Sequence, residues 1–325
     1  MKLIIIGSGN WGTTLAQIFA PRNNVYLWTI DDQEADEINK NRENRSFLPG
    51  VELDRNIIVE KKFSHKVMSD DVIIIAIPSR KIEELADEFV ESDINKCIVV
   101  NASKGVEHST LRTISETFCK KLPEIKFATL SGPTIAKEIA QGLPAKAILA
   151  SKNISILFKL QEILRNDYLK FDFNQDVKGV ELAASLKGLI AIAVGIADGL
   201  GLQTNIFGVI MTYGLHEYKT VMEFLGVSTK TAYSIAGMGD LITTCISENS
   251  RNRKFGKLLA KGYSRDEALA KVGMVVEGVS MAKTVNKLTK FNLSIPLIAW
   301  ITHIICDDVS NIKDELLCTI NSISE

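Results

Sequence analysis

Ten residues near the start of the chain decide its fold: Leu3-Ile4-Ile5-Ile6-Gly7-Ser8-Gly9-Asn10-Trp11-Gly12. An apolar run leads directly into a Gly-x-Gly-x-x-Gly pattern, which indicates a dinucleotide site only when a buried strand precedes it and a helix follows. Residues 13–20 meet the second condition, because Leu15, Ile18 and Phe19 recur at helical spacing. We therefore expect a strand, a glycine turn and a helix whose free N-terminal amides face a pyrophosphate.

Each glycine of the pattern has its own task. Gly7 permits the tight turn, Gly9 lets the backbone approach the pyrophosphate without a Cβ, and Gly12 lets the helix pack close to the strand. A chance cluster of glycines is the alternative interpretation. The apolar run before the cluster, the helix after it and a second strand over Val25–Trp28 favour the dinucleotide site.

Asp31 follows this second strand, where an acid commonly accepts hydrogen bonds from the adenosine ribose hydroxyls and so favours NAD. NADP would favour Arg or Lys here, and the neighbours Thr29 and Ile30 carry no charge. Three cations of the following segment could still reach a 2′-phosphate of NADP, namely Lys40, Arg42 and Arg45. Asp31 has a second interpretation, as the cap of a helix that begins near residue 32. The cofactor is therefore NAD or NADP, with the sequence favouring NAD.

Length and composition predict a soluble protein of two domains. A chain of 325 residues exceeds one comfortable core, and 38 basic against 39 acidic residues give no basic field for nucleic acid. The longest uninterrupted apolar stretch, residues 188–197, is about half of the ~20 residues that span a bilayer. The N-terminus shows no signal or transit segment, so we expect a cytoplasmic protein that is not membrane-integral.

Cysteine and histidine spacing predicts neither a metal site nor a disulfide framework. The five cysteines are scattered and odd in number, and the four histidines add no ligand pattern. The histidines are His65, His108, His216 and His303.

The first half of the chain alternates short β-rich runs with amphipathic helices, which is typical of a doubly wound, mostly parallel α/β sheet. From about residue 176 the β pattern disappears and helical patterns follow, beginning with a nearly all-apolar helix over 177–198. We expect a Rossmann-type domain over 1–175 and an all-α domain over 176–325. The expected strands are Lys2–Ile6, Val25–Trp28, Ile57–Glu60, Val72–Ile77, Cys97–Asn101, Phe127–Leu130, Ala145–Ala150 and Leu169–Phe173.

Lys187 lies inside the apolar helix of the second domain, beside Leu186, Leu189 and Ile190. Burial lowers the pKa of a lysine toward neutral pH, where it exchanges protons as a general base. A snorkelling lysine whose ammonium reaches solvent is the alternative interpretation.

Two polar stretches of the second domain, and one lysine of the first, complete the candidate chemistry. Ala236-Gly237-Met238-Gly239-Asp240 places an acid in a glycine-rich break, and Ser250-Arg251-Asn252-Arg253 offers an oxyanion site. The alternative for the latter is a helix capped by Ser250. Lys104 follows an expected strand, so its ammonium can project over the edge of the sheet at which the cofactor binds. The alternative interpretation is an unpaired surface lysine. Together these residues indicate hydride transfer to or from a phosphorylated or carboxylated alcohol.

With these residues the chain resembles the bacterial NAD(P)-dependent glycerol-3-phosphate dehydrogenases over nearly its full length. The resemblance rests on blocks that occur in family order. They are Gly7–Gly12, Phe47–Gly50, Ile77–Ser79, Ser103–Gly105, Leu130–Thr134, Gly142–Pro144, Gly179–Leu182, Asp198–Gly201, Ala236–Asp240 and Ser250–Arg253.

This resemblance implies interconversion of glycerol 3-phosphate and dihydroxyacetone phosphate, feeding phospholipid synthesis, with Lys187 as the proton acceptor. It also implies two sets of binding residues. The cofactor set is Gly7, Gly9, Asn10, Trp11, Gly12, Lys104, Ala136, Arg251, Val275 and Glu277. The substrate set is Lys104, Gly132, Thr134, Lys187, Asp240, Ser250, Arg251 and Asn252.

The chain departs from the family pattern at four places. Gly188 replaces the Asn that usually follows the lysine, and Ala183-Ala184 replaces a Gly-Gly pair. Tyr213 replaces an Arg of the next helix, and Ile30 stands where the family often has a cation for the 2′-phosphate.

Two rival functions remain open from the sequence. One is a two-domain dehydrogenase of hydroxy acids, in which Arg251 binds a carboxylate. The other is a protein that binds dinucleotide and signals redox state through a partner, although mere cofactor binding needs neither Lys187 nor Asp240. A homodimer is a further expectation.

Overall fold

The computed structural model describes residues 1–61, 68, 70–92, 94–107, 112–291, 293–307, 309 and 311–323. The chain forms two compact units. Unit 1 comprises Met1–Ser103 and Ile114–Val177, and unit 2 comprises Lys104–Thr113 and Lys178–Glu325. The domain boundary expected between residues 175 and 176 stays a prediction.

Unit 1 contains one eight-stranded sheet in the order β3-β2-β1-β4-β5-β6-β7-β8. Neighbouring strands are parallel except β6 and β7, which are antiparallel. The order reverses between β1 and β4, and this reversal is the switch point at which ligands bind in open α/β sheets. The strands are β1 Leu3–Ile6, β2 Val25–Trp28, β3 Ile57–Glu60, β4 Val72–Ile75, β5 Ile98–Asn101, β6 Lys126–Ser131, β7 Ala145–Ala150 and β8 Leu169–Asn174.

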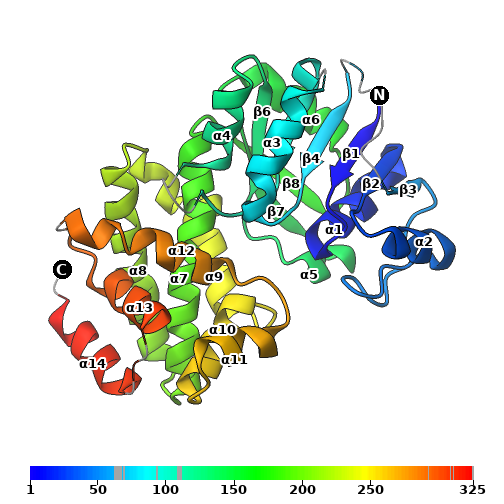
Figure 1. Cartoon of the computed structure of the whole chain (residues 1–325). Coiled ribbons are helices and arrows are strands. Elements are labelled where there is room, and N and C mark those ends of the chain that lie inside the picture. Colours follow the sequence, from blue (N-terminus) through cyan, green and yellow to red (C-terminus); the bar gives the residue numbers. More distant parts are fainter. Residues whose placement is uncertain are drawn as a thin grey trace. The chain divides into compact units, whose positions relative to one another are not determined.

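Helices cover both faces of this sheet, as the doubly wound expectation requires. β1, β4 and β5 are buried along their whole length, which is why they read as continuous β-branched runs. On one face Phe89 and Phe118 join Phe127, and Figure 1 shows their helices α3 and α4 side by side. The helices are α1 Asn10–Phe19, α2 Asp32–Asn41, α3 Ile82–Val90, α4 Ile114–Lys121, α5 Ala136–Ala140 and α6 Ile154–Ile163.

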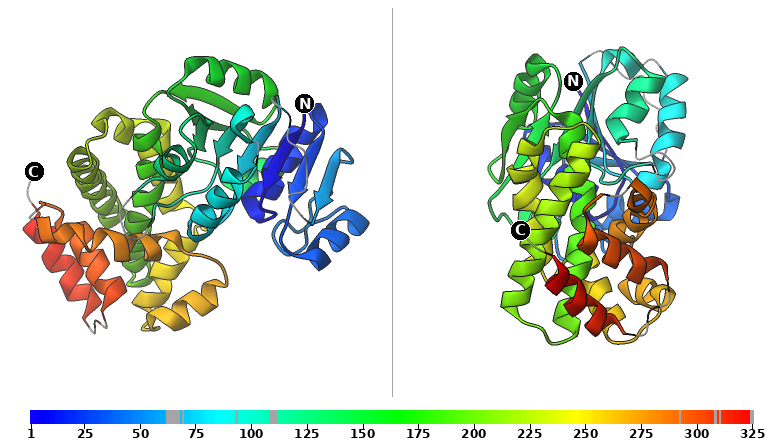
Figure 2. Two further views of the ribbon diagram at one scale, coloured as in Figure 1. Left: turned by 45° about the horizontal axis from the view of Figure 1, so that its top comes forward. Right: turned by 90° about the vertical axis from the view of Figure 1, so that its left-hand side faces the viewer.

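The regular elements of unit 2 are helices in the part that the structure describes, as expected for the second half of the chain, apart from an isolated antiparallel bridge between Val106 and Thr113. Both views of Figure 2 show α14 beside α13, and α8 and α12 also pack on α13. The helices are α7 Val177–Gly199, α8 Thr204–Phe224, α9 Asp240–Ile246, α10 Arg251–Ala260, α11 Arg265–Val272, α12 Glu277–Val285, α13 Pro296–Cys306 and α14 Ile312–Ser322.

Helix α7 is the core helix of unit 2. Among the described residues it alone is long and apolar enough to cross a membrane, with a mean hydropathy of 1.8 over an 18-residue window. The uninterrupted apolar run 188–197 is only part of this helix, so the prediction that no apolar segment is long enough to span a bilayer was wrong for α7. The whole window is buried inside the protein, which is the arrangement of a core helix in a soluble enzyme fold.

Helices α7 and α12 approach each other closely at two glycines. A Cβ on Gly188 would lie 3.0 Å from Cα of Gly278, and a Cβ on Gly278 would lie 2.8 Å from the Gly188 carbonyl oxygen. The Gly188 that departs from the family pattern therefore serves a close helix crossing.

Candidate functional site

The glycine loop between β1 and α1 has the shape that a pyrophosphate needs. Gly7 has φ of +112°, in the region that favours glycine, and a Cβ on Gly12 would lie 1.8 Å from the Gly7 carbonyl oxygen. A Cβ on Gly9 would meet nothing within 4 Å, so the space in front of this residue is open. Gly9 is also the N-cap of α1, without a side-chain hydrogen bond to the free amides. These amides are available to an anion.

Two residues that the sequence interpretation missed hold this loop in place. The carbonyl oxygen of Ser8 accepts hydrogen bonds from Thr13 Oγ1 and Asn44 Nδ2, both at 2.8 Å. Asn44 Nδ2 also donates to Thr13 Oγ1 at 2.9 Å, and both side chains are buried. No spacing rule links a residue at position 44 to the glycine pattern, so the sequence carried no signal for this contact.

Buried polar atoms near the loop and at the end of β6 have no partner within the described part of unit 1. They are Asn10 Oδ1 and Ser131 Oγ, and Trp28 Nε1 and Glu34 Oε1 are two more such atoms of unit 1. Trp11 is half-buried and packs on the unit 1 core. Unpaired buried polar atoms cost free energy unless a ligand satisfies them. The open Gly9, the free amides and Asn10 therefore fit a dinucleotide.

Asp31 caps helix α2, which was the alternative interpretation of this residue. Its Oδ1 accepts from the backbone N–H groups of Gln33 at 2.9 Å and Glu34 at 3.1 Å. Oδ2 makes no hydrogen bond to any residue that the structure describes, so one carboxylate oxygen is left for a ligand. Ile30 is 80% exposed beside it.

Three of the predicted binding residues of unit 1 lie after β6. Thr134 Oγ1 donates to the Gly132 carbonyl oxygen at 3.1 Å, which stabilises the turn before α5. The Ala136 carbonyl oxygen accepts from Thr14 Oγ1 at 3.4 Å and so connects α5 to α1. Gly132, Thr134 and Ala136 thus belong to unit 1, whereas the other predicted substrate residues belong to unit 2.

The buried Lys187 and Asp240 and the partly exposed Lys104 form one cluster in unit 2, which we call the charged cluster. Lys187 is 6% exposed and contacts Asp240 Oδ1, while Lys104 Nζ lies 3.3 Å from Asp240 Oδ2. The snorkelling alternative for Lys187 is therefore wrong, as is the unpaired alternative for Lys104. Asp240 is the first residue of α9, and its carbonyl oxygen accepts from Thr244 Oγ1 at 2.7 Å.

The electrostatics of the charged cluster suit proton transfer. Desolvation lowers the pKa of Lys187 to about 7, with Lys104 acting in the same direction and Asp240 opposing both. A lysine in this range exists in both protonation states near neutral pH, which is the requirement for a reversible acid and base. The neighbouring Cys245 is inert, because burial raises its pKa to about 12.

The Ser250–Arg253 stretch forms the first turn of α10. Ser250 Oγ accepts from the Arg253 backbone N–H at 3.3 Å, so the capping alternative is correct for this serine. Arg251 is exposed and makes no ion pair or hydrogen bond with any residue in the described part of the chain. Asn252 Oδ1 accepts from the Gly278 backbone N–H at 3.1 Å and so connects α10 to α12.

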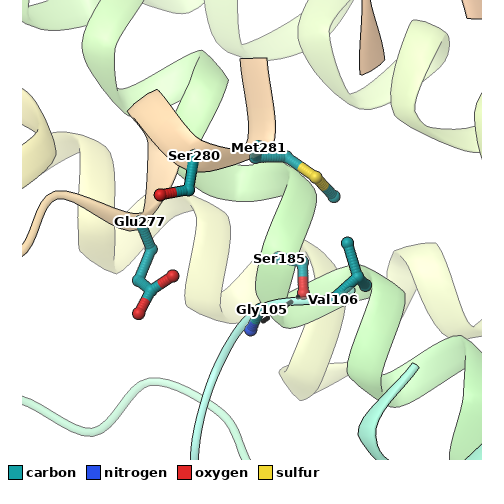
Figure 3. A pocket seen from close by; sticks show the side chains of 6 residues that line it. All are labelled: Gly105, Val106, Ser185, Glu277, Ser280 and Met281. Carbon is teal, nitrogen blue, oxygen red and sulfur yellow. Dashed lines mark hydrogen bonds between the residues drawn. The ribbon is translucent and has the colours of Figure 1, made fainter. Parts of the chain in front are cut away.

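A small pocket opens between α7, α12 and the segment after Lys104, again within unit 2. Figure 3 shows Glu277 and Ser280 projecting from α12, and Ser185 from α7. Ser185 Oγ accepts from the Gly105 backbone N–H at 3.2 Å. Although Arg251 is exposed, neighbouring protein atoms partly desolvate its guanidinium and lower its pKa, and the negative charge of Glu277 opposes this shift. No sequence pattern singles out Ser185 or Ser280, because lone serines in helices are common.

The remaining residues named in the sequence analysis are Tyr213, Val275 and the histidines. Tyr213 is half-buried and packs on the unit 2 core, and Val275 precedes α12. The described residues contain no group of three or more His, Cys, Asp or Glu side chains that could hold a metal, whereas His65 and His108 lie outside the described residues.

Comparison with known proteins agrees with this arrangement. The family described as "NAD-dependent glycerol-3-phosphate dehydrogenase N-terminus" matches residues 2–157, and the corresponding C-terminus matches residues 176–314. Two similar proteins carry the name glycerol-3-phosphate dehydrogenase [NAD(P)+]. The protein from Fusobacterium nucleatum is 35% identical to this chain, over 95% of this chain and 93% of that protein. The protein from Bacillus cereus is also 35% identical, over 96% of this chain and 93% of that protein.

A solved structure supports the same assignment over both units. The crystal structure of glycerol-3-phosphate dehydrogenase from Coxiella burnetii has a TM-score of 0.90 and 30% identity, covering 98% of this chain and 97% of that one. The resemblance predicted from sequence motifs is thereby confirmed. This chain belongs to the NAD-dependent glycerol-3-phosphate dehydrogenase family.

Proposed function

We propose that this protein interconverts sn-glycerol 3-phosphate and dihydroxyacetone phosphate with NAD(P). In the oxidative direction glycerol 3-phosphate and NAD(P)+ give dihydroxyacetone phosphate, NAD(P)H and one proton. The observation that carries the proposal is the buried Lys187, in contact with Asp240 and with a pKa of about 7, within a member of this dehydrogenase family. Cofactor binding alone needs no such lysine, which argues against the redox sensor.

Lys187 moves the proton of the reaction. As a neutral amine its Nζ accepts the proton of the C2 hydroxyl while hydride leaves C2, and as an ammonium it returns that proton to the carbonyl oxygen in the reductive direction. Asp240 orients the Lys187 amine through their direct contact. Lys104, held by the same carboxylate, supplies positive charge for the oxygen that develops negative charge in the transition state.

Arg251 and Asn252 bind the phosphate of the substrate, with Ser250, Gly132 and Thr134 as further contacts. The guanidinium of Arg251 makes no hydrogen bond or ion pair with a described residue, although the charge of Glu277 acts on it, and its planar fork matches two phosphate oxygens. The amide nitrogen of Asn252 remains as a donor, because its Oδ1 is used by the Gly278 backbone N–H. A carboxylate offers only two oxygens to the same groups, so a phosphorylated alcohol suits them better than a hydroxy acid.

The dinucleotide supplies the hydride chemistry when bound, by accepting hydride from C2 or returning it. The free amides at the start of α1 hold its pyrophosphate, the shape of the loop at Gly7, Gly9 and Gly12 leaves room for it, and Asn10 supplies a buried acceptor. The remaining cofactor residues in this proposal are Trp11, Lys104, Ala136, Arg251, Val275 and Glu277.

We propose further that NAD is preferred to NADP. The exposed Ile30 offers no charge to a 2′-phosphate, and the free Oδ2 of Asp31 repels one. Two of the three cations that follow are engaged: Arg42 donates to the carbonyl oxygens of Ile57 and Asp54, and Arg45 pairs with Glu43 at 3.1 Å. Lys40 is exposed at the end of α2.

Fluorescence titration of NADH and NADPH binding tests this preference without any turnover. The unmodified protein is expected to bind NADH more tightly, and Ile30→Arg should improve NADPH binding relative to NADH by about tenfold, the effect of one charge-assisted hydrogen bond. Ile30→Leu is the matched control. Equal affinities of the unmodified protein for both cofactors would refute the preference.

The compartment and the oligomeric state of the protein are further parts of this proposal. All five cysteines are free, which supports a reducing compartment such as the cytoplasm. We expect a homodimer that binds no nucleic acid and whose glycerol 3-phosphate enters phospholipid synthesis. Light scattering after gel filtration measures the oligomeric state directly, and a monomer would refute the dimer.

Loss of absorbance at 340 nm with NADH or NADPH and dihydroxyacetone phosphate tests the reaction. Turnover with dihydroxyacetone phosphate, competitively inhibited by inorganic phosphate, is the expected result. Turnover with a 2-keto acid instead would favour the hydroxy acid rival. NADH binding without turnover of either substrate would favour the redox sensor.

A further inference from the structure

The two arginines of the first turn of α10 have opposite environments. Arg251 is exposed, whereas Arg253 is 9% exposed and two residues farther along, on the other side of the helix. Its Nη2 lies 2.6 Å from Asp198 Oδ2, and its Nη1 lies 2.7 Å from the Ile246 carbonyl oxygen and 2.8 Å from Glu248 Oε1. Arg253 therefore joins the end of α7, the end of α9 and the start of α10.

The backbone of α10 lies directly on α7 at this point. A Cβ on Gly195 would lie 2.2 Å from the Arg253 carbonyl oxygen, and a Cβ on Gly256 would lie 2.2 Å from the Ile192 carbonyl oxygen. No side chain separates the two helices here, so a small rotation of α10 about this contact moves its whole first turn. The ion pairs of Arg253 oppose such a rotation.

Helix α7 also carries the lysine of the charged cluster. Lys187 precedes Gly195 by eight residues, or about 12 Å along the helix axis. The distance between the lysine amine and the phosphate-binding turn is therefore determined by how α10 lies on α7. A displacement of about 1 Å is enough to weaken a directional site.

We propose that Arg253 is a positioning residue, whose contacts with Asp198, Ile246 and Glu248 hold Arg251 and Asn252 in the orientation that binds the substrate phosphate. It touches neither substrate nor cofactor. This inference rests on the proposed function, since it assumes that Arg251 and Asn252 bind the phosphate.

Lys257 is the matched control for Arg253, because it shares the same two carboxylates. Lys257 Nζ lies 2.7 Å from Asp198 Oδ2 and 3.2 Å from Glu248 Oε2. It lies one turn farther along α10 and has no bond to Ile246. Lys257→Met therefore removes two ion pairs without releasing the first turn.

Steady-state kinetics of Arg253→Met, Arg253→Lys and Lys257→Met test the proposal. We expect Arg253→Met to raise the KM for dihydroxyacetone phosphate about tenfold, the loss of one charge-assisted hydrogen bond to the phosphate, with kcat changed less than about twofold. Arg253→Lys should fall between it and the unmodified protein, because an ammonium cannot reach all three acceptors. Lys257→Met should leave KM unchanged.

The affinity for inorganic phosphate, measured by isothermal titration calorimetry, gives a second readout that needs no turnover. It should weaken in Arg253→Met and Arg253→Lys but not in Lys257→Met. An unchanged KM and phosphate affinity in folded Arg253→Lys would overturn the proposal, and this variant decides the question if Arg253→Met does not fold. An equal effect of Lys257→Met would also overturn it. Failure of the proposed function is distinguishable, because the unmodified protein would then not turn over dihydroxyacetone phosphate at all.

Discussion

The glycine loop of unit 1 and the charged cluster of unit 2 are built in opposite ways. The loop presents backbone amides at a place where side chains are absent, and a Cβ on Gly12 would collide with the carbonyl oxygen of Gly7. The cluster presents side-chain charges in a place where water is excluded, with Lys187 and Asp240 in direct contact. The loop is therefore sensitive to shape and the cluster to charge and pH.

The largest effect should come from removing the amine of the charged cluster. Lys187→Met keeps an unbranched side chain that is one atom shorter but abolishes proton transfer, so kcat should fall by about 10³-fold or more. The affinity for NADH, measured by fluorescence, should stay unchanged because the loop of unit 1 is intact. Lys261→Met, an exposed lysine at the end of α10, is the control and should retain full turnover. Substantial turnover by Lys187→Met would remove this residue from its role.

Two variants of the glycine loop separate its effect on the stability of unit 1 from its effect on NADH affinity. Gly12→Ala should destabilise unit 1 outright, because its Cβ would lie 1.8 Å from a carbonyl oxygen. Gly9→Ala should leave the melting temperature unchanged, since its Cβ meets no protein atom within 4 Å, yet weaken NADH binding by about tenfold or more. Thermal melts with and without NADH measure both effects. Unimpaired NADH binding by Gly9→Ala would contradict the placement of the pyrophosphate.

The charge network predicts a shift in the pH profile. Lys104 helps to lower the pKa of Lys187, so Lys104→Met should move the midpoint of kcat/KM toward higher pH. In the reductive direction, which needs the ammonium form, activity should then persist to higher pH than in the unmodified protein. The phosphate of the substrate titrates near pH 6 in both proteins and cancels in the comparison. A midpoint that moves to lower pH would contradict this role.

The smallest effect concerns a buried carboxyl of unit 2 outside the charged cluster. Glu217 accepts from the backbone N–H groups of Leu297 at 2.8 Å and Ile298 at 2.7 Å, at the start of α13. Desolvation raises its pKa from 4.5 to about 7, against the opposing effect of these hydrogen bonds. Its contribution to stability is therefore fully present below about pH 4.5 and is lost as the pH rises through about 7.

Glu217→Gln removes this titration. The melting temperature of the variant relative to the unmodified protein should rise by several degrees between about pH 5 and pH 8, at about 2–4 °C per kcal/mol. Differential scanning calorimetry at several pH values measures this difference. A constant difference across that range would show that Glu217 does not titrate as described.

Most of unit 1 could be predicted from the sequence, because buried parallel strands read as continuous β-branched runs. All eight expected strands are present, and α1 begins at Asn10 rather than at Thr13. The antiparallel pairing of β6 with β7 could not be predicted, since strand direction leaves no trace in a run of buried residues. The capping role of Asp31 was one of two interpretations that only the backbone geometry distinguishes.

The charged cluster was only partly predictable. An apolar helix around Lys187 signalled a perturbed lysine, but its contact with Asp240 joins residues far apart in the chain and follows from tertiary packing. The environment of Gly188 has the same origin, because it depends on where Gly278 of α12 lies. Likewise, no sequence rule distinguishes the exposed Arg251 from the buried Arg253.

The most direct test of the contrast between the two regions is a pair of pH titrations on the unmodified protein. One follows kcat/KM for dihydroxyacetone phosphate reduction, and the other follows the dissociation constant of NADH, both from about pH 6 to pH 9. We predict that kcat/KM falls as the pH rises through about 7, where Lys187 loses its proton, while NADH affinity stays constant. A pH-independent kcat/KM, or an NADH affinity that follows the same titration, would contradict the account.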